Sequence, residues 1–143
     1  MSAVGSVVSH LLGDTKVRGR VGQKVYRAVA ARKAELPYIV VQKIGARRVR
    51  HMTAVAGLVA MSLQVACWAD AVSGSDELAD FVRRSLDHRN HEDVGSQPNV
   101  VALNAAFLES EIEDVVPAAV GGGSIFGTIM TWTIWHTETV PTF

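Results

Sequence analysis

Two histidines in the sequence have a spacing that suits metal binding. His88 and His91 lie three residues apart, and Glu92 and Asp93 follow them directly. Imidazole and carboxylate groups are common zinc ligands. The pattern places no third ligand, however, and a polar loop explains these residues equally well. We therefore expect no metal ion and no other cofactor.

An acidic run offers a second candidate for chemistry. Glu109, Glu111, Glu113 and Asp114 lie within six residues of one another. Paired carboxylates can perform acid–base catalysis or hold a cation. In an extended strand, alternation would instead place Glu109, Glu111 and Glu113 along one solvated strand edge. We favour the edge, and expect no catalytic residue here.

Two further features are weaker candidates for a site. The run Gly121, Gly122, Gly123, Ser124 is glycine-rich but has no lysine after it, so a turn explains it better than a phosphate-binding loop. The single cysteine, Cys67, stands in an alternating apolar row. That setting favours a buried structural thiol over a nucleophile, and one cysteine excludes an intramolecular disulfide.

A basic segment is the most informative polar feature. Arg47, Arg48, Arg50 and His51 lie in residues 45–52, which we predict to connect two strands. Such a positive tip can meet nucleic-acid phosphates with salt-sensitive affinity, or an acidic protein surface. If the chain acts alone, a solvated loop explains the arginines.

The charges are divided between two parts of the chain. Residues 1–50 carry eleven basic and two acidic side chains, a net charge of +9, and residues 51–143 carry three and twelve, a net charge of −9. The formal net charge of zero therefore conceals two blocks. They predict oppositely charged surfaces for partners or self-association, unless folding intermixes them.

The length and composition indicate one folded domain over residues 1–143. Apolar residues make up 48% of the chain, which excludes intrinsic disorder. We expect no signal peptide, no membrane-spanning helix and a reducing compartment.

Periodicity predicts elements that position these residues. Apolar spacings of three and four predict helices over 2–12 and 73–86, whereas alternation predicts strands over 36–44, 58–68, 99–111 and 125–136, with a shorter one around Val25 and Tyr26. Residues 111–123 are expected to form a long turn.

This order predicts an α+β fold, with an antiparallel sheet of four to five strands and two helices packed on one face. The other face is expected to expose Trp68, or Trp132 and Trp135. The predicted core consists of Val59, Met61, Leu63, Val65, Phe81, Val82 and Leu86.

Several short stretches together resemble the tail completion, or tail terminator, proteins of long-tailed bacteriophages. Besides the two helices, the matching stretches are RVG at 20–22, VY at 25–26, ELPYIVVQ at 35–42, LQVACWA at 63–69 and WTIW at 132–135. Ala66 stands where the family commonly has an acidic or polar residue. Residues 90–123 match least.

The resemblance implies a structural virion protein of the tail or neck, not an enzyme, assembled in the host cytoplasm. Family members form rings, typically hexamers, that cap the tail tube, stop its polymerisation and join the head. The expected partners are the major tail tube protein and a head–tail connector or stopper protein, while DNA passes through the lumen without specific binding. Charge-matched subunit edges would use Arg47, Arg48 and Arg50 against Glu109, Glu111, Glu113 and Asp114.

Two alternatives remain open at this point. One is a nucleic-acid-binding module that uses the basic 47–51 loop. The other is a small α+β enzyme that uses His88, His91 or the carboxylates of residues 109–114.

Overall fold

The computed structural model describes residues 3–28, 35–50, 55–87, 92–94, 101–116 and 124–137. The elements, in chain order, are α1 (Ala3–Gly13), α2 (Thr15–Val21), β1 (Val25–Arg27), β2 (Tyr38–Arg50), β3 (Val55–Ala69), α3 (Val72–Leu86), β4 (Glu92–Val94), β5 (Val101–Val116) and β6 (Ile125–Thr137).

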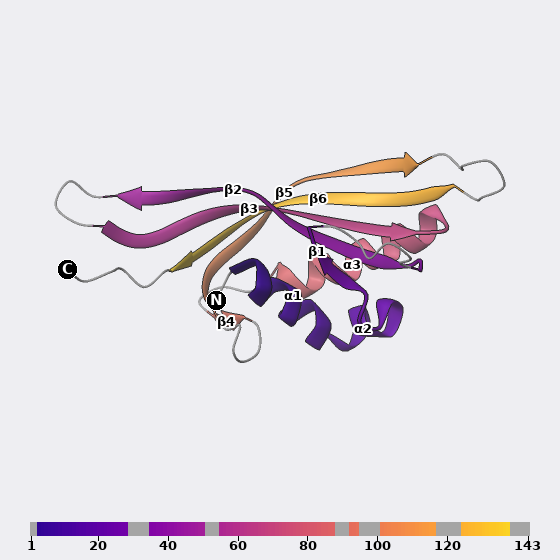
Figure 1. The fold of residues 1–143 in the computed structure, drawn as a ribbon, viewed down its shortest axis with the longest axis horizontal. Helices are drawn as coiled ribbons and strands as arrows, with labels where there is room; N and C mark the ends of the chain where they lie inside the picture. The colour runs from indigo at the N-terminus through magenta and orange to yellow at the C-terminus, as the bar shows by residue number, and fades with distance from the viewer. Residues whose placement is uncertain are drawn as a thin grey trace.

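The strands form one sheet in the order β1-β2-β3-β6-β5-β4. Four long strands make its body, and every adjacent pair is antiparallel except β1 and β2, which are parallel. The three helices gather on one side of the sheet, below the strands in Figure 1. The α+β prediction is therefore confirmed.

The details of the fold differ from the prediction in several respects. The short strand predicted around Val25 and Tyr26 is present as β1, but it pairs with β2 in parallel, so the sheet is not wholly antiparallel. A second three-residue strand, β4, lies in a segment expected to be a polar loop and brings the sheet to six strands. A third helix, α2, begins directly after α1, because the Asp14 carboxylate accepts hydrogen bonds from the backbone N–H groups of Lys16 and Val17. Single polar residues of this kind are weak signals beside a long apolar period.

Two predicted connections were wrong, because they are strand. Residues 45–50 continue β2 in register with β3, through shifts between Lys43 and Gly45 and between Arg48 and Arg50. Residues 111–116 likewise continue β5 along β6. Charged residues argue against a strand only where both faces of that strand are buried. These two segments lie at the exposed borders of the sheet, where charged side chains remain in solvent.

Side chains on β3 and β6 alternate between a helix-covered and an uncovered face. On the covered face Leu63 lies opposite Trp132, and both are fully buried. Of the residues expected in the core, Val59, Met61, Leu63, Val65, Val82 and Leu86 are buried, while Phe81 is partly buried against them. The placement of Trp132 on an exposed face was therefore wrong, since its register with Leu63 turns the indole toward the helices.

Phe81 packs partly against the core and also contacts α2. The guanidinium carbon of Arg20 lies 5.7 Å from the centre of the Phe81 ring. Arg20 also forms an ion pair with Glu77, one turn earlier on α3. These contacts dock α2 against α3.

The uncovered face is largely polar and uncharged at its centre. Ser62, Gln64, Thr131 and Thr133 lie there, all half-buried. In the ranges that the structure describes, no helix lies on this side of the sheet, as Figure 1 shows.

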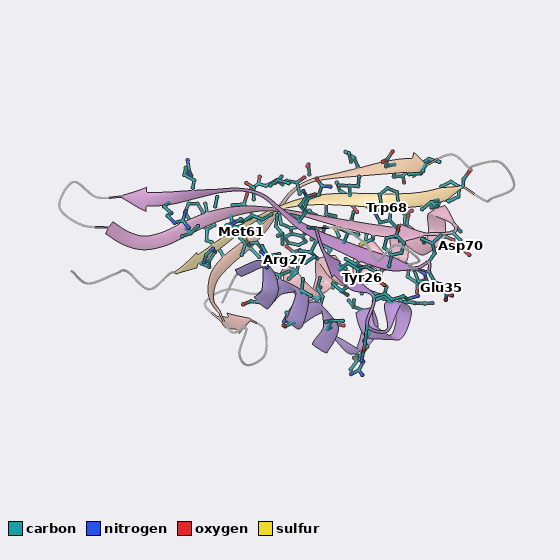
Figure 2. The ribbon with its side chains drawn as sticks, in the orientation of Figure 1. Tyr26, Arg27, Glu35, Met61, Trp68 and Asp70 are labelled. Atoms are coloured by element: carbon teal, nitrogen blue, oxygen red, sulfur yellow. The ribbon has the colours of Figure 1, made fainter. Side chains whose placement is uncertain are left out.

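Trp68 packs across Gly127 on the uncovered face. The two residues are register partners on β3 and β6, and a Cβ atom at Gly127 would lie 2.6 Å from two carbons of the indole. Met61, on the same strand but at odd spacing from Trp68, lies on the covered face (Figure 2). Only glycine leaves room for the indole to lie flat there.

Replacing Leu63 with aspartate should abolish folding. A carboxylate at this fully buried position would have no partner, at a cost of about 5 kcal/mol or more, comparable with the whole stability of a domain this size. Circular dichroism and thermal melting would measure the loss. Gln64→Asp, one residue along on the uncovered face, is the control and should melt cooperatively. A cooperative melt of Leu63→Asp would refute the face assignment.

Gly127→Ala should destabilise the fold by about 1–3 kcal/mol, because the new methyl group overlaps the Trp68 ring. The loss of stability caused by Gly127→Ala should be smaller in a Trp68→Leu background, where the indole ring is absent. Urea unfolding of the wild type, the two single variants and the double variant would measure this difference. Gly19→Ala is the control, since a Cβ there meets nothing within 4 Å, and it should stabilise α2 by about 1 kcal/mol. Equal costs in both backgrounds would contradict the proposed contact.

Candidate functional site

The charged segments lie at the two borders of the sheet. β1 pairs with β2 only along Ile39–Val41, and β4 pairs with β5 only along Val101–Leu103. Beyond these short pairings, residues 42–50 and 104–116 have no outer strand neighbour within the described ranges. Both borders therefore present strand edges to their surroundings.

The basic edge, as we term Lys43, Arg47 and Arg48 on β2, is exposed. Lys43 and Arg48 lie opposite the buried residues Leu63 and Val59, which places them on the covered face. Arg47 lies opposite Ala60, on the uncovered face. The backbone of Arg50 belongs to β2, but its side chain, like His51, lies outside the described part of the molecule.

The acidic edge, as we term Glu109, Glu111, Glu113 and Asp114 on β5, is likewise exposed. Glu111 and Glu113 lie opposite Met130 and Thr128, on the covered face, and Asp114 lies on the other. The register shifts between Leu108 and Ser110, so Glu109 is the unpaired residue of a β-bulge. The three glutamates are exposed along one border strand, as expected, but the bulge takes Glu109 out of the alternation that Glu111 and Glu113 follow.

A small cavity of about 280 Å³ adjoins the acidic edge. It is lined by Asp76, Glu111, Ile112, Glu113 and Thr128. Asp76 is already engaged, because it accepts a hydrogen bond from the Thr128 hydroxyl at 3.4 Å. Within the described residues, no group of three or more His, Cys, Asp or Glu side chains is placed to hold a metal ion. Both glutamates are exposed, so neither has the buried setting of a catalytic acid.

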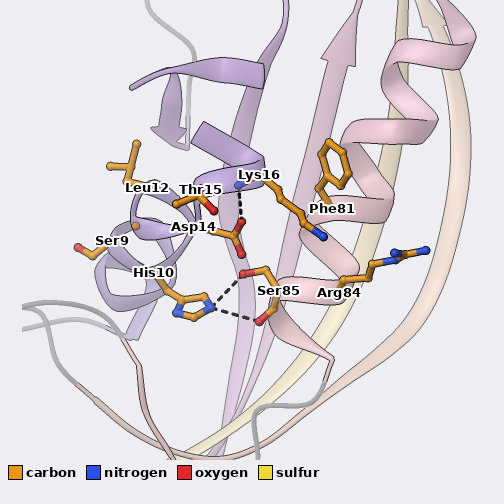
Figure 3. A pocket seen from close by; sticks show the side chains of 10 residues that line it. Ser9, His10, Leu12, Asp14, Thr15, Lys16, Phe81, Arg84 and Ser85 are labelled. Carbon is orange, nitrogen blue, oxygen red and sulfur yellow. Dashed lines mark hydrogen bonds between the residues drawn. The ribbon is translucent and has the colours of Figure 1, made fainter. Parts of the chain in front are cut away.

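A larger cavity, of about 750 Å³, lies between α1, α2 and α3 (Figure 3). Its lining includes His10, Asp14 and Ser85, which have the residue types of a catalytic triad. The Nε2 atom of His10 lies 3.0 Å from the Ser85 hydroxyl and 3.1 Å from the Ser85 carbonyl oxygen. No periodic signal in the sequence indicates this grouping, because the histidine and the serine lie 75 positions apart.

The arrangement of these three groups does not suit nucleophilic catalysis. A carbonyl oxygen only accepts hydrogen bonds, so the His10 Nε2 that contacts it carries the proton and cannot deprotonate the serine. Asp14 contacts the serine instead of orienting the histidine. Ser85 is also buried. The cluster joins α1, α2 and the end of α3 structurally.

The ionisation of Asp14 and Cys67 follows from their surroundings. Burial alone would raise the pKa of Asp14, but hydrogen bonds from the Val17 N–H, the Ser85 hydroxyl and the Lys16 N–H outweigh it and lower the pKa. Burial, with a smaller contribution from the charge of Glu111, raises the pKa of the Cys67 thiol far above its ordinary range. Cys67 is therefore a structural residue and not a nucleophile.

Other sequence candidates fall outside the described residues. His88, His91 and the glycines at 121–123 are among them. Glu92 and Asp93 form part of β4, with their backbones paired to β5. No helix among the described residues is long and apolar enough to cross a membrane.

Comparisons with known proteins were made on both sequence and fold. A family model described as tail completion protein gp17 matches residues 5–114. A chain in the solved virion of a native gene transfer agent (GTA) particle has a similar fold, with a TM-score of 0.67 and 15% sequence identity, over 95% of this chain and 99% of that one. No curated protein sequence gives a significant match.

Replacing Asp14 with alanine should destabilise the protein by about 1 kcal/mol near neutral pH, because the cap of α2 is lost. Since the pKa of Asp14 is lowered in the folded state, the stability from its ionised form is complete above its ordinary value of 3.8. This contribution to stability is lost as the pH falls through the lower pKa that Asp14 has in the folded protein. The gap between wild type and variant should therefore narrow below pH 3.8, as measured by urea unfolding from pH 7 down to pH 3 and below.

Asp14→Asn is the matched control, since an amide oxygen still caps the helix but does not titrate. It should keep most of the stability at pH 7. A gap between wild type and Asp14→Ala that stays constant across the whole pH range would contradict the assigned role of the carboxylate.

Proposed function

Because the chain belongs to the family of tail completion protein gp17, we propose that it caps the phage tail tube as an oligomeric ring. The chain is a structural protein of the virion, located at the tail or neck. The ring, expected to be a hexamer, would stop polymerisation of the tube and join it to the head. Its proposed partners are the major tail tube protein on one side and a connector or stopper protein on the other.

The observation that supports a ring is the position of the two charged edges. The basic and acidic edges lie on opposite borders of one sheet, on β2 and β5. A surface that is complementary to a different surface of the same molecule produces head-to-tail contacts, and these close into rings when the rotation permits. The proposed subunit interface therefore consists of Arg47, Arg48 and Arg50 against Glu109, Glu111, Glu113 and Asp114.

Passage of DNA without specific binding is part of the same proposal. Duplex DNA binds proteins mainly through phosphate contacts with Lys and Arg. Arg47 and Arg48 lie on opposite faces of β2, so they do not form a patch together on either face. This separation favours a protein interface over the alternative nucleic-acid module.

Purified protein added to tail tubes should bind their ends and stop their growth. Electron microscopy in negative stain would show one ring-shaped density per capped tube, and mass photometry should show a single discrete oligomer, at least with tube protein present. Tubes that elongate equally with and without the protein, together with a strictly monomeric chain, would refute the proposal.

The nucleic-acid alternative makes a different prediction in the same preparation. It requires salt-dependent binding of duplex DNA that is lost when Arg47, Arg48 and Arg50 become glutamate. We expect no such binding by the wild-type protein, as measured by fluorescence anisotropy over a salt series. Tight, salt-sensitive binding would favour the alternative.

A further inference from the structure

Within the described residues, each border of the sheet ends in backbone groups that no neighbouring strand pairs with. Along residues 104–116 of β5 and 42–50 of β2, no outer ladder is present in the described molecule. An open strand edge is a template for another strand. The two open stretches also reach opposite ends of the molecule, with β2 extending to the left and β5 to the right in Figure 1.

The charges on these edges decide which edges can meet. Like charges opposed across two strands are unfavourable, so acidic β5 disfavours a second β5 and basic β2 disfavours a second β2. Opposite charges favour β5 against β2. If both edges carried charges of the same sign, the charges would keep all edges apart and would only prevent aggregation. With opposite signs, two identical edges still repel each other, which excludes a two-fold dimer, but the basic edge of one copy can meet the acidic edge of the next in a head-to-tail contact.

We propose that β5 of one copy pairs with β2 of the next copy and continues the sheet from subunit to subunit. The proposal rests on the proposed ring and specifies its interface. Within one copy β2, β3, β6 and β5 alternate in direction, so β2 and β5 run oppositely. Repeating the same orientation around a ring therefore makes the junction antiparallel, like the pairs inside each copy.

Apolar side chains on the open strands support this pairing. Ile112 and Phe107 on β5 are 58% and 51% exposed, and Ile44 at the bulge of β2 is 51% exposed. Ile112 and Phe107 share the uncovered face, opposite Ile129 and Thr133. A neighbouring strand would cover these groups, because side chains on adjacent strands pack against each other.

The open stretches also account for how such a sheet can close. Strands in a closed sheet must tilt and be staggered from one neighbour to the next. Pairing residues 104–116 of β5 in one copy with residues 42–50 of β2 in the next copy produces that stagger. One face of the closed sheet then lines the lumen. The helices fit on the outside of the ring, where the circumference is larger, so the uncovered face is the one that lines the lumen.

Charge reversal on one edge at a time tests the proposal. Lys43→Glu, Arg47→Glu and Arg48→Glu together make both edges acidic, and Glu109→Lys, Glu111→Lys and Glu113→Lys together make both edges basic. Each triple variant alone should reduce the fraction of protein in the oligomer by about tenfold or more, as measured by mass photometry. An equimolar mixture of the two should restore the oligomer, because every junction then joins opposite charges. A control that reverses charges away from the edges, Lys16→Glu with Arg18→Glu on α2, should assemble like the wild type.

Hydrogen exchange separates strand pairing from side-chain contact alone. Amides in residues 105–116 and 42–48 should exchange about tenfold or more slowly in the wild-type oligomer than in either monomeric variant. Unchanged exchange in an intact ring, or rings formed by each variant alone, would overturn the pairing and leave the ring proposal standing. A wild-type chain that forms no ring even with tube protein would overturn both.

Discussion

The unbroken pairing of β3 with β6 is the constraint on which the rest of the fold depends. These two strands stay in register from Leu58 opposite Thr137 to Ala69 opposite Phe126. Because side chains alternate strictly in a strand, this one register assigns every residue of both strands to a face. The fully buried apolar residues then lie on the helix-covered face, whereas the other face carries small and polar residues together with Trp68.

The outer long strands follow a looser rule. β2 and β5 each contain register shifts, whereas β3 and β6 contain none between them. A bulge costs little where one side of the strand has no neighbour, and it turns charged side chains to new directions. The central pair thus forms the regular middle of the sheet, and the bulged strands beside it distribute the charges over both faces at each border.

Elements with a long apolar period could be predicted from the sequence. The prediction failed where a single polar group or the pairing with a partner strand determines the structure. The alternation of residues 58–68 identified β3 and its buried row correctly. The continuation of β2 through Arg47 and Arg48 was missed, because pairing with β3 stabilises a segment whose own composition indicates a loop. Trp132 was placed wrongly, since the face of β6 depends on its register with Leu63. The His10–Ser85 contact joins residues 75 positions apart, which periodicity cannot detect.

The separation of charge between its two borders gives the sheet an electric dipole. Its positive end lies at the basic edge of β2 and its negative end at the acidic edge of β5, with the net charge near zero. Two such molecules feel little net attraction or repulsion at long range, but each orients the other as they approach. In the proposed ring, neighbouring copies would then meet already aligned, and the rate of their encounter would fall as salt shortens the range of the field.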